Sequence, residues 1–217
     1  MRVFHFLCEH YGLENIRHRR LKIARLAELN DPFEFLARAD SIAQRAALRA
    51  TKEEQSRKIG LLCFSQSWSN PVQWSHYADR HRGLCLGFDI SDADAQPVTY
   101  RKTPIRFDLA KYQSDNLYAQ EFANSMISSK FSDWSYEKEV RLYVRLDPKT
   151  KKDGLYFYEF SNELRLSEVI VGAASNLTRQ QLLSALGNLS GQVRMRKARM
   201  AFRSYRIVEQ HNSSLWS

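Results

Sequence analysis

The sequence lacks any apolar run long enough to cross a membrane, so we expect no transmembrane helix and no membrane partner. Its first seven residues turn polar too soon for a secretory signal. Cysteine is scarce, with three residues that are far apart in the chain. This scarcity excludes a disulfide framework and a structural zinc site, and it favours a reducing compartment. Together these absences predict a cytoplasmic protein.

Repeats, low-complexity tracts and an evident domain boundary are also lacking among the 217 residues. The length suits one large domain, so we predict a single α+β domain over residues 1–210, followed by a loose tail over 211–217. What the chain does have is positive charge, with 33 lysines and arginines against 24 acids and a net charge of +9. Such a surface attracts polyanions and anionic small molecules without specificity.

Short strands dominate the predicted elements, and we expect mostly antiparallel sheets with flanking helices. The predicted strands cover residues 2–7, 20–24, 60–65, 83–90, 98–102, 139–146, 155–160, 166–171, 193–199 and 205–208. The predicted helices cover 9–17, 33–49, 71–81, 109–130 and 178–189. Residues 51–58 are interpreted as a charged surface segment. Glu34 falls near the positive end of the helix predicted to start at residue 33.

The most informative stretch is residues 134–141, Trp-Ser-Tyr-Glu-Lys-Glu-Val-Arg. Glu137, Glu139 and Arg141 occupy alternate positions, and apolar Val140 and Leu142 occupy the positions between and after them. Alternation with period two is typical of a half-buried strand, which would place both acids and the guanidinium on one face. Such a face can stabilise a developing positive charge. The simpler interpretation is a solvated strand face with a Glu–Arg bridge.

Metal chemistry has little support in the sequence. His76, Asp79 and His81 are close together in the chain, but their spacing does not place three ligands on one helical face. We therefore predict no metal site.

Several short motifs together resemble a bacterial family known as domain of unknown function 2971. They match in order and spacing over about residues 4–172. The motifs are Leu-Asn-Asp-Pro-Phe-Glu at 29–34, Cys-Phe-Ser at 63–65, Trp-Ser-His-Tyr-Ala at 74–78, Gly-Leu-Cys-Leu-Gly-Phe-Asp at 83–89, the stretch 134–141, and Val-Ile-Val-Gly at 169–172. The family label names no activity.

A more distant resemblance is to ADP-ribosyltransferases, including toxins that modify nucleic acid. It implies a split core that holds NAD between two small sheets. It also implies an NAD-dependent ADP-ribosyltransferase or NAD-glycohydrolase, acting as a toxin or phage-defence effector on nucleic acid or protein. Matched by position, His5 would bind the nicotinamide-side ribose or a phosphate, and Ser65 would end the middle strand. Glu139 would be the catalytic acid, and Glu137 would orient the acceptor.

The chemistry of NAD cleavage explains why these residue types are needed. Breaking the nicotinamide–ribose bond creates an oxocarbenium-like ribose, which a carboxylate stabilises. A flat nicotinamide ring stacks on an aromatic wall, and the pyrophosphate needs a cation. The candidates for these roles are Phe64, Trp74, Tyr77 and Tyr136 for the wall, and Arg20 or Arg141 for the cation. Structural alternatives stay open, because His5, Ser65, Trp74 and Tyr77 also fit ordinary core positions.

A basic stretch near the carboxyl end supports a different function. The cations alternate with Val193 and Met195 and form a predicted one-sided stripe of Arg194, Arg196, Lys197, Arg199 and Arg203. The alternative function is therefore a nucleic-acid-binding or nucleolytic defence protein without NAD chemistry. Edge strands also carry such charges to prevent edge pairing. A third possibility is a partner-binding module with Trp74 and Trp134 as exposed anchors.

Overall fold

The computed structural model describes residues 1–216 and has an α+β fold with mostly antiparallel strand pairing. Its contacts divide the chain into two compact units, which are described separately. Unit 1 contains residues 1–22, 64–95 and 157 to the carboxyl end, and unit 2 contains residues 23–63 and 96–156. The single domain predicted over 1–210 stays a prediction.

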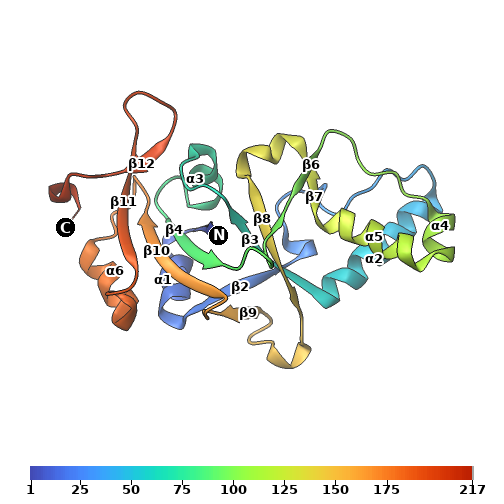
Figure 1. Cartoon of the computed structure of the whole chain (residues 1–217), viewed down its shortest axis with the longest axis horizontal. Helices are drawn as coiled ribbons and strands as arrows, with labels where there is room; N and C mark the ends of the chain where they lie inside the picture. Colours follow the sequence, from blue (N-terminus) through green and yellow to red (C-terminus); the bar gives the residue numbers. More distant parts are fainter. Residues whose placement is uncertain (217) are drawn as a thin grey trace. The chain divides into compact units, whose positions relative to one another are not determined.

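The sheet of unit 1 has the strand order β12-β11-β10-β4-β1. Its strands are β1 (Arg2–Leu7), β4 (Leu84–Ile90), β10 (Leu164–Val171), β11 (Arg194–Met200) and β12 (Ile207–Glu209). Pairing is antiparallel except between β10 and β11, which run parallel. The connection between this parallel pair contains α6 (Arg179–Leu186), which packs beside α1 (Glu9–His18) (Figure 1). A parallel connection of this kind normally needs a helix to return the chain.

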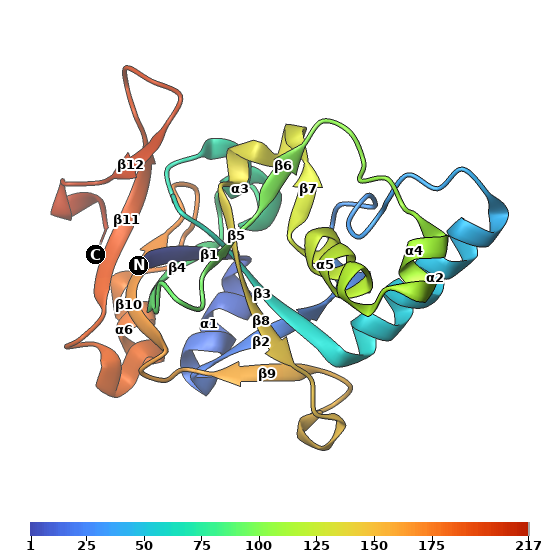
Figure 2. The same ribbon diagram turned by 45° about the vertical axis from the view of Figure 1, so that its right-hand side comes forward.

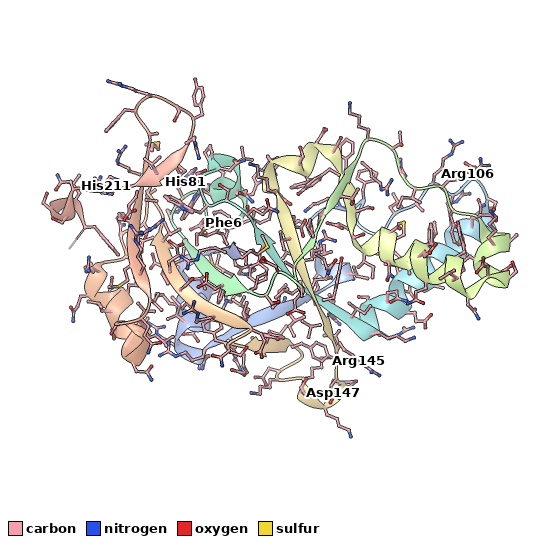
Figure 3. All side chains as sticks on the ribbon, viewed as in Figure 1. Phe6, His81, Arg106, Arg145, Asp147 and His211 are labelled. Atoms are coloured by element: carbon pink, nitrogen blue, oxygen red, sulfur yellow. The ribbon has the colours of Figure 1, made fainter. Side chains whose placement is uncertain are left out.

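The core of unit 1 is aromatic and lies against the helix α3 (Pro71–Tyr77). Trp74 of this helix is fully buried, meets Phe6 edge-to-face with ring centroids 5.3 Å apart, and stacks on His81 at 6.4 Å. Figure 3 labels Phe6 and His81. Asn70 caps α3, and Pro71 begins it, because a first-turn proline loses no helical hydrogen bond.

Unit 2 contains two sets of strands. β3 (Ile59–Ser65) pairs with β2 (Arg20–Arg25) and with β8 (Glu139–Arg145), and β8 also pairs with β5 (Gln96–Pro97). A separate parallel pair consists of β6 (Thr99–Arg101) and β7 (Ser129–Phe131). Arg145 and Asp147, labelled in Figure 3, mark the end of β8 and the turn before the short η3 (Pro148–Thr150). β9 (Tyr156–Glu159) follows, and β2, β3 and β9 each run from one unit into the other.

The helices of unit 2 are α2 (Ile42–Lys58), α4 (Leu109–Ser114) and α5 (Asn116–Ile127), which Figure 2 shows together. Leu48 of α2 and Phe122 of α5 join one buried cluster with Phe35 and Phe107. Two short 3₁₀ turns, η1 (Leu26–Glu28) and η2 (Ser132–Glu137), precede residues of the candidate site.

The helix predicted over residues 33–49 is wrong in its position. Ser41 and Gln44 form a reciprocal capping box, so the helix starts at Ile42 and continues through the segment predicted to be only a charged surface stretch. Residues 32–35 form turns instead, and Phe35 has a φ of 56°, which no helix accommodates. The long helix predicted over 109–130 is two helices, because Asp115 caps a new one.

The other predicted strands and helices are confirmed to within a few residues. In the predicted tail, Asn212 caps a short η5 (Ser213–Leu215), and the Trp216 indole donates to the Leu177 carbonyl at 3.0 Å. Residue 217 lies outside the described residues. Over the part of the chain that the structure describes, no helix is both long and apolar enough to span a bilayer.

Candidate functional site

Unit 2 contains a buried group of charged side chains, here called the ionic cluster. Its members are Glu34, Lys130, Glu137, Glu139 and Arg141. Arg141 is fully buried, and the other four side chains are at most 7% exposed. Charged side chains are almost never buried this deeply unless they are paired, so the cluster needs every contact it makes.

Lys130 lies at the centre of the three acids. Its ammonium nitrogen is 2.6 Å from Glu137 Oε2, 3.1 Å from Glu139 Oε2 and 3.5 Å from Glu34 Oε1. It also lies 4.9 Å from the centre of the Trp134 ring, which is a cation–π distance. Lys130 belongs to β7, and its strand partner Tyr100 accepts a hydrogen bond from the Glu139 amide at 2.7 Å. The short parallel pair β6–β7 therefore positions the lysine against the start of β8.

Arg141 holds the other side of the cluster together. Its guanidinium donates to Glu139 Oε1 at 2.7 Å, to Glu34 Oε1 at 2.6 Å and to the Ile127 carbonyl at 2.6 Å. These bonds tie β8 to the end of α5 and to the turn that carries Glu34. Charge-assisted bonds of this kind are about twice as strong as neutral ones.

Two residues with left-handed backbone place the acids. Lys138, with a φ of 47°, stands between Glu137 and Glu139, and Phe35, with a φ of 56°, follows Glu34. Left-handed backbone is costly for residues other than glycine, and it persists where the surrounding contacts fix it. The prediction that Glu137 belongs to the strand is wrong, because η2 ends at Glu137 and β8 starts at Glu139. The solvated strand face is also wrong, since Glu139 and Arg141 are buried.

The electrostatics divide the acids into two kinds. Burial alone would raise the pKa of Glu139, but Arg141 and Lys130 outweigh it and hold that pKa below its ordinary value. For Glu34, burial dominates and raises the pKa, although the same two cations oppose it. Burial would lower the pKa of Lys130, yet Glu139 and Glu137 raise it, so the lysine stays charged. Glu139 is therefore a carboxylate, and Glu34 takes up a proton more readily than Glu139 does.

The ionic cluster is not neutral when all its groups are ionised, because it has three carboxylates and two cations. The buried Oε2 atom of Glu34 also has no hydrogen-bond partner within residues 1–216. A buried excess of negative charge is relieved by a proton or by a nearby positive charge. The cluster can thus favour positive charge that develops next to it.

A cavity of about 250 Å³ adjoins the cluster at Lys130. Its walls are largely apolar, with Phe33, Phe35 and Phe131 among the lining residues. Arg101 and Lys102 also line it and are exposed. Apolar walls with a few convergent polar groups are typical of small-molecule sites. Lys130 is the cluster member that lines this cavity.

Two further aromatic residues belong to this region. The rings of Trp134 and Tyr136 lie 6.0 Å apart, and both side chains are half-buried. Burial and the charge of Glu137 raise the pKa of the Tyr136 hydroxyl to about 12, so it remains protonated. Tyr136, Glu137, Glu139 and Arg141 are thus the predicted site residues that the fold brings together.

The remaining predicted NAD-binding residues lie in unit 1. The His5 ring meets Phe64 edge-to-face at 5.7 Å, and the Arg20 guanidinium lies 3.7 Å from the centre of the Phe157 ring. The Ser65 hydroxyl donates to the Ser67 carbonyl at 2.9 Å.

The α3 side chains in the same prediction are packed in the core of unit 1. The fully buried Trp74 donates its indole N–H to the Trp68 carbonyl at 2.6 Å, and Tyr77 packs against the same core. The prediction of Trp74 as an exposed partner anchor is therefore wrong. The cofactor-binding roles stay predictions.

The predicted basic stripe is partly neutralised within unit 1. Arg194 pairs with Glu209 at 3.0 Å, Arg196 pairs with Glu168 at 3.2 Å, and Lys197 donates to the carbonyls of Gly172 and Ser175. β12 pairs with β11 only at residues 198–200, so the edge-strand explanation stays a prediction for Arg194 and Arg196. Arg199 and Arg203 remain beside the turn that follows β11.

Sequence reasoning did not select Glu34, Lys130 or Tyr100 as site residues. Glu34 lies in the Leu-Asn-Asp-Pro-Phe-Glu motif at residues 29–34, and that motif could have identified it as a candidate site residue. Lys130 had no such signal, because its acidic partners lie in two other segments, one at residue 34 and one at residues 137–139. Within residues 1–216, no three histidine, cysteine, aspartate or glutamate side chains come together in a way that would hold a metal ion.

Comparison with known proteins gives one partial match, to a family model. Searches of curated proteins and of solved structures returned no significant match. Residues 73–142, which include most of α3, all of β7 and four of the five members of the ionic cluster, match the model of a family described as protein of unknown function (DUF2971).

Proposed function

We propose that this protein is an NAD-dependent ADP-ribosyltransferase or NAD-glycohydrolase whose reaction centre is the ionic cluster of unit 2 with its adjoining cavity. In this reaction the bond from ribose to nicotinamide breaks, and a bond forms from ribose to an acceptor nucleophile or water, with release of a proton. The ribose gains positive charge as the bond breaks. A toxin or a phage-defence effector is the biological role that fits such chemistry.

The observation that carries the proposal is the position of Lys130. This one residue lines the cavity and contacts three buried carboxylates, so it links a small-molecule-sized space to an excess of negative charge. A preorganised negative charge in a water-poor site stabilises a developing cation far more than the same charge would in water.

Each acid has a distinct role in the proposal. Glu139 stays ionised, so it supplies the negative charge that stabilises the ribose cation. Glu137 orients the acceptor. Glu34 has a raised pKa and an oxygen without a hydrogen-bond partner within residues 1–216, so it is suited to receive the proton that the acceptor releases.

The cavity fits one end of the dinucleotide. Its volume of about 250 Å³ suits a ring with its sugar, and its phenylalanine walls suit a flat nicotinamide. Arg101 and Lys102 supply cations for the pyrophosphate. An ADP-ribosyltransferase-like core remains part of this proposal, and the NAD-binding roles of His5, Arg20, Ser65, Trp74 and Tyr77 stay predictions made from the sequence.

NAD is expected to raise the thermal midpoint of the full chain, and to release nicotinamide on incubation. A ligand at about 100 times its Kd stabilises the native state by about 2.7 kcal/mol. Thr103 is an exposed cavity residue, so Thr103→Trp should block the cavity and remove both effects. Ala93→Trp, in an exposed loop of unit 1, should keep both. A midpoint that does not respond to NAD, with no nicotinamide release, would reject the proposal.

The alternative function, nucleic-acid binding, has one specific observation in its favour. The last residue of β11 and the turn that leads to β12, residues 200–206, are here called the aromatic hairpin. It exposes Met200, Phe202 and Tyr205 by 71%, 92% and 100%, with Arg199 and Arg203 beside them. Exposed rings between arginines are suited to stack on the bases of a single strand.

If the aromatic hairpin binds single-stranded nucleic acid, Phe202→Ser with Tyr205→Ser should weaken oligonucleotide binding by about tenfold or more per ring, measured by fluorescence anisotropy. Tyr11→Ser removes a ring that is 63% exposed elsewhere in unit 1 and should change nothing. Affinity should fall as salt rises, because phosphate contacts release counterions. Equal affinity for the double variant and the native chain would remove this alternative.

A further inference from the structure

Unit 2 has a second cavity, here called the basic cavity, with a volume of about 600 Å³. It shares no lining residue with the cavity beside Lys130. Five cations and one acid line it, and they are Arg25, Arg49, Lys52, Arg57, Lys151 and Glu53. The single acid leaves a large excess of positive charge on one concave surface.

The cations come from three separate segments of the chain. Arg49, Lys52 and Glu53 recur at helical spacing along α2, and Ser56 and Arg57 follow one turn later on the same face. Arg25 ends β2, and Lys151 follows η3. Folding brings these cations to one cavity, although like charges in proximity repel one another.

Only some of these cations have partners within the protein. Arg25 pairs with Glu28 at 2.7 Å, and Lys52 donates to the Glu34 carbonyl at 2.7 Å. Lys151 lies 5.9 Å from the centre of the Tyr156 ring. Arg49 and Arg57 are exposed, and neither forms an ion pair within residues 1–216. The two arginines are therefore available to an anion that enters the cavity.

The geometry favours a chain of phosphates over a single anion or a base. Several cations spread across a cavity of this volume match charge that is also spread along a ligand. Arginine binds phosphate oxygens in a bidentate fashion, and lysine adds point charges. Tyr156 is half-buried and already has Lys151 over its ring, so it offers little to a nucleobase.

We propose that the basic cavity is a binding site for a small oligophosphate, either free or as the phosphate chain of a nucleotide. The evidence for this site does not rest on the proposed NAD chemistry. Lys52 nevertheless bonds to the backbone of Glu34, so an anion that attracts Lys52 also acts on the turn that carries an acid of the ionic cluster.

Isothermal titration calorimetry of the full chain with tripolyphosphate tests the proposal. Each charge-assisted hydrogen bond is worth on the order of tenfold in affinity. Arg49→Gln with Arg57→Gln should therefore weaken binding at least about tenfold. Both residues are exposed on α2, so the variant should fold. The control variant, Arg45→Gln with Lys58→Gln, removes the same charge from the same helix outside the cavity and should bind as the native chain does.

Titrations with other ligands distinguish the possible occupants of the basic cavity. ATP that binds as well as tripolyphosphate supports recognition of the phosphate chain, whichever source supplies it. Equal weakening in the cavity and control variants, or no heat with tripolyphosphate, would overturn the proposal. A single-stranded oligonucleotide that binds while tripolyphosphate fails to displace it would overturn it too. Nicotinamide release should be the same in both double variants, so failure here is distinct from failure of the NAD proposal.

Discussion

Replacing Arg141 by leucine is expected to lower the free energy of unfolding by about 3–5 kcal/mol, the usual cost of removing one partner from a buried ion pair. The guanidinium is fully buried and donates to Glu34, to Glu139 and to the Ile127 carbonyl. Without it, one lysine remains for three buried carboxylates. Urea unfolding of the native and variant chains measures the difference.

A double variant separates charge imbalance from lost packing. Arg141→Leu with Glu139→Leu removes one cation and one acid, which restores the original difference in charge, so the double variant should be more stable than Arg141→Leu alone. Arg165→Leu is the matched control, because its side chain is 67% exposed in its pair with Asp89 and should contribute no more than about 1 kcal/mol. A cost for Arg141→Leu that is as small as the control's would contradict the cluster's role in stability.

The sequence predicted most strands of this fold because their signal is local. A continuous apolar run predicted β3, and alternation predicted β4 and β8, because burial of both faces or of one face of a strand produces these patterns. The start of α2 was misplaced for a related reason. Phe35, Leu36 and Ala39 resembled a helical face, but Phe35 and Leu36 instead line a cavity beside turns.

The candidate site was predictable only in part. Glu139 and Arg141 stand two residues apart on one strand, so their pairing follows from strand geometry. Strand alternation misplaced Glu137, because one left-handed residue, Lys138, turns the chain just before β8. Tertiary packing brings Lys130 and Glu34 into the cluster. No spacing pattern in the sequence predicts these contacts.

Glu139→Gln is expected to lower the rate of nicotinamide release at least about 100-fold, because loss of one preorganised electrostatic group typically costs two to three orders of magnitude. The amide keeps the size of the side chain but removes the negative charge next to the developing cation. A single-turnover assay at saturating NAD measures this step apart from binding. The thermal midpoint in NAD should still rise, since the cavity itself is unchanged.

Glu168→Gln distinguishes catalysis from loss of a buried charge. Glu168 of unit 1 is 2% exposed and pairs with Arg2 at 3.0 Å and Arg196 at 3.2 Å, so it matches Glu139 in burial and in kind of partner. Both variants should lose stability, but Glu168→Gln should keep its activity per folded molecule. Activity that falls in both variants in proportion to stability would show that Glu139 only supports the fold. Full activity in Glu139→Gln would remove the carboxylate from the mechanism, because Glu139 is the acid that Arg141 and Lys130 together hold ionised.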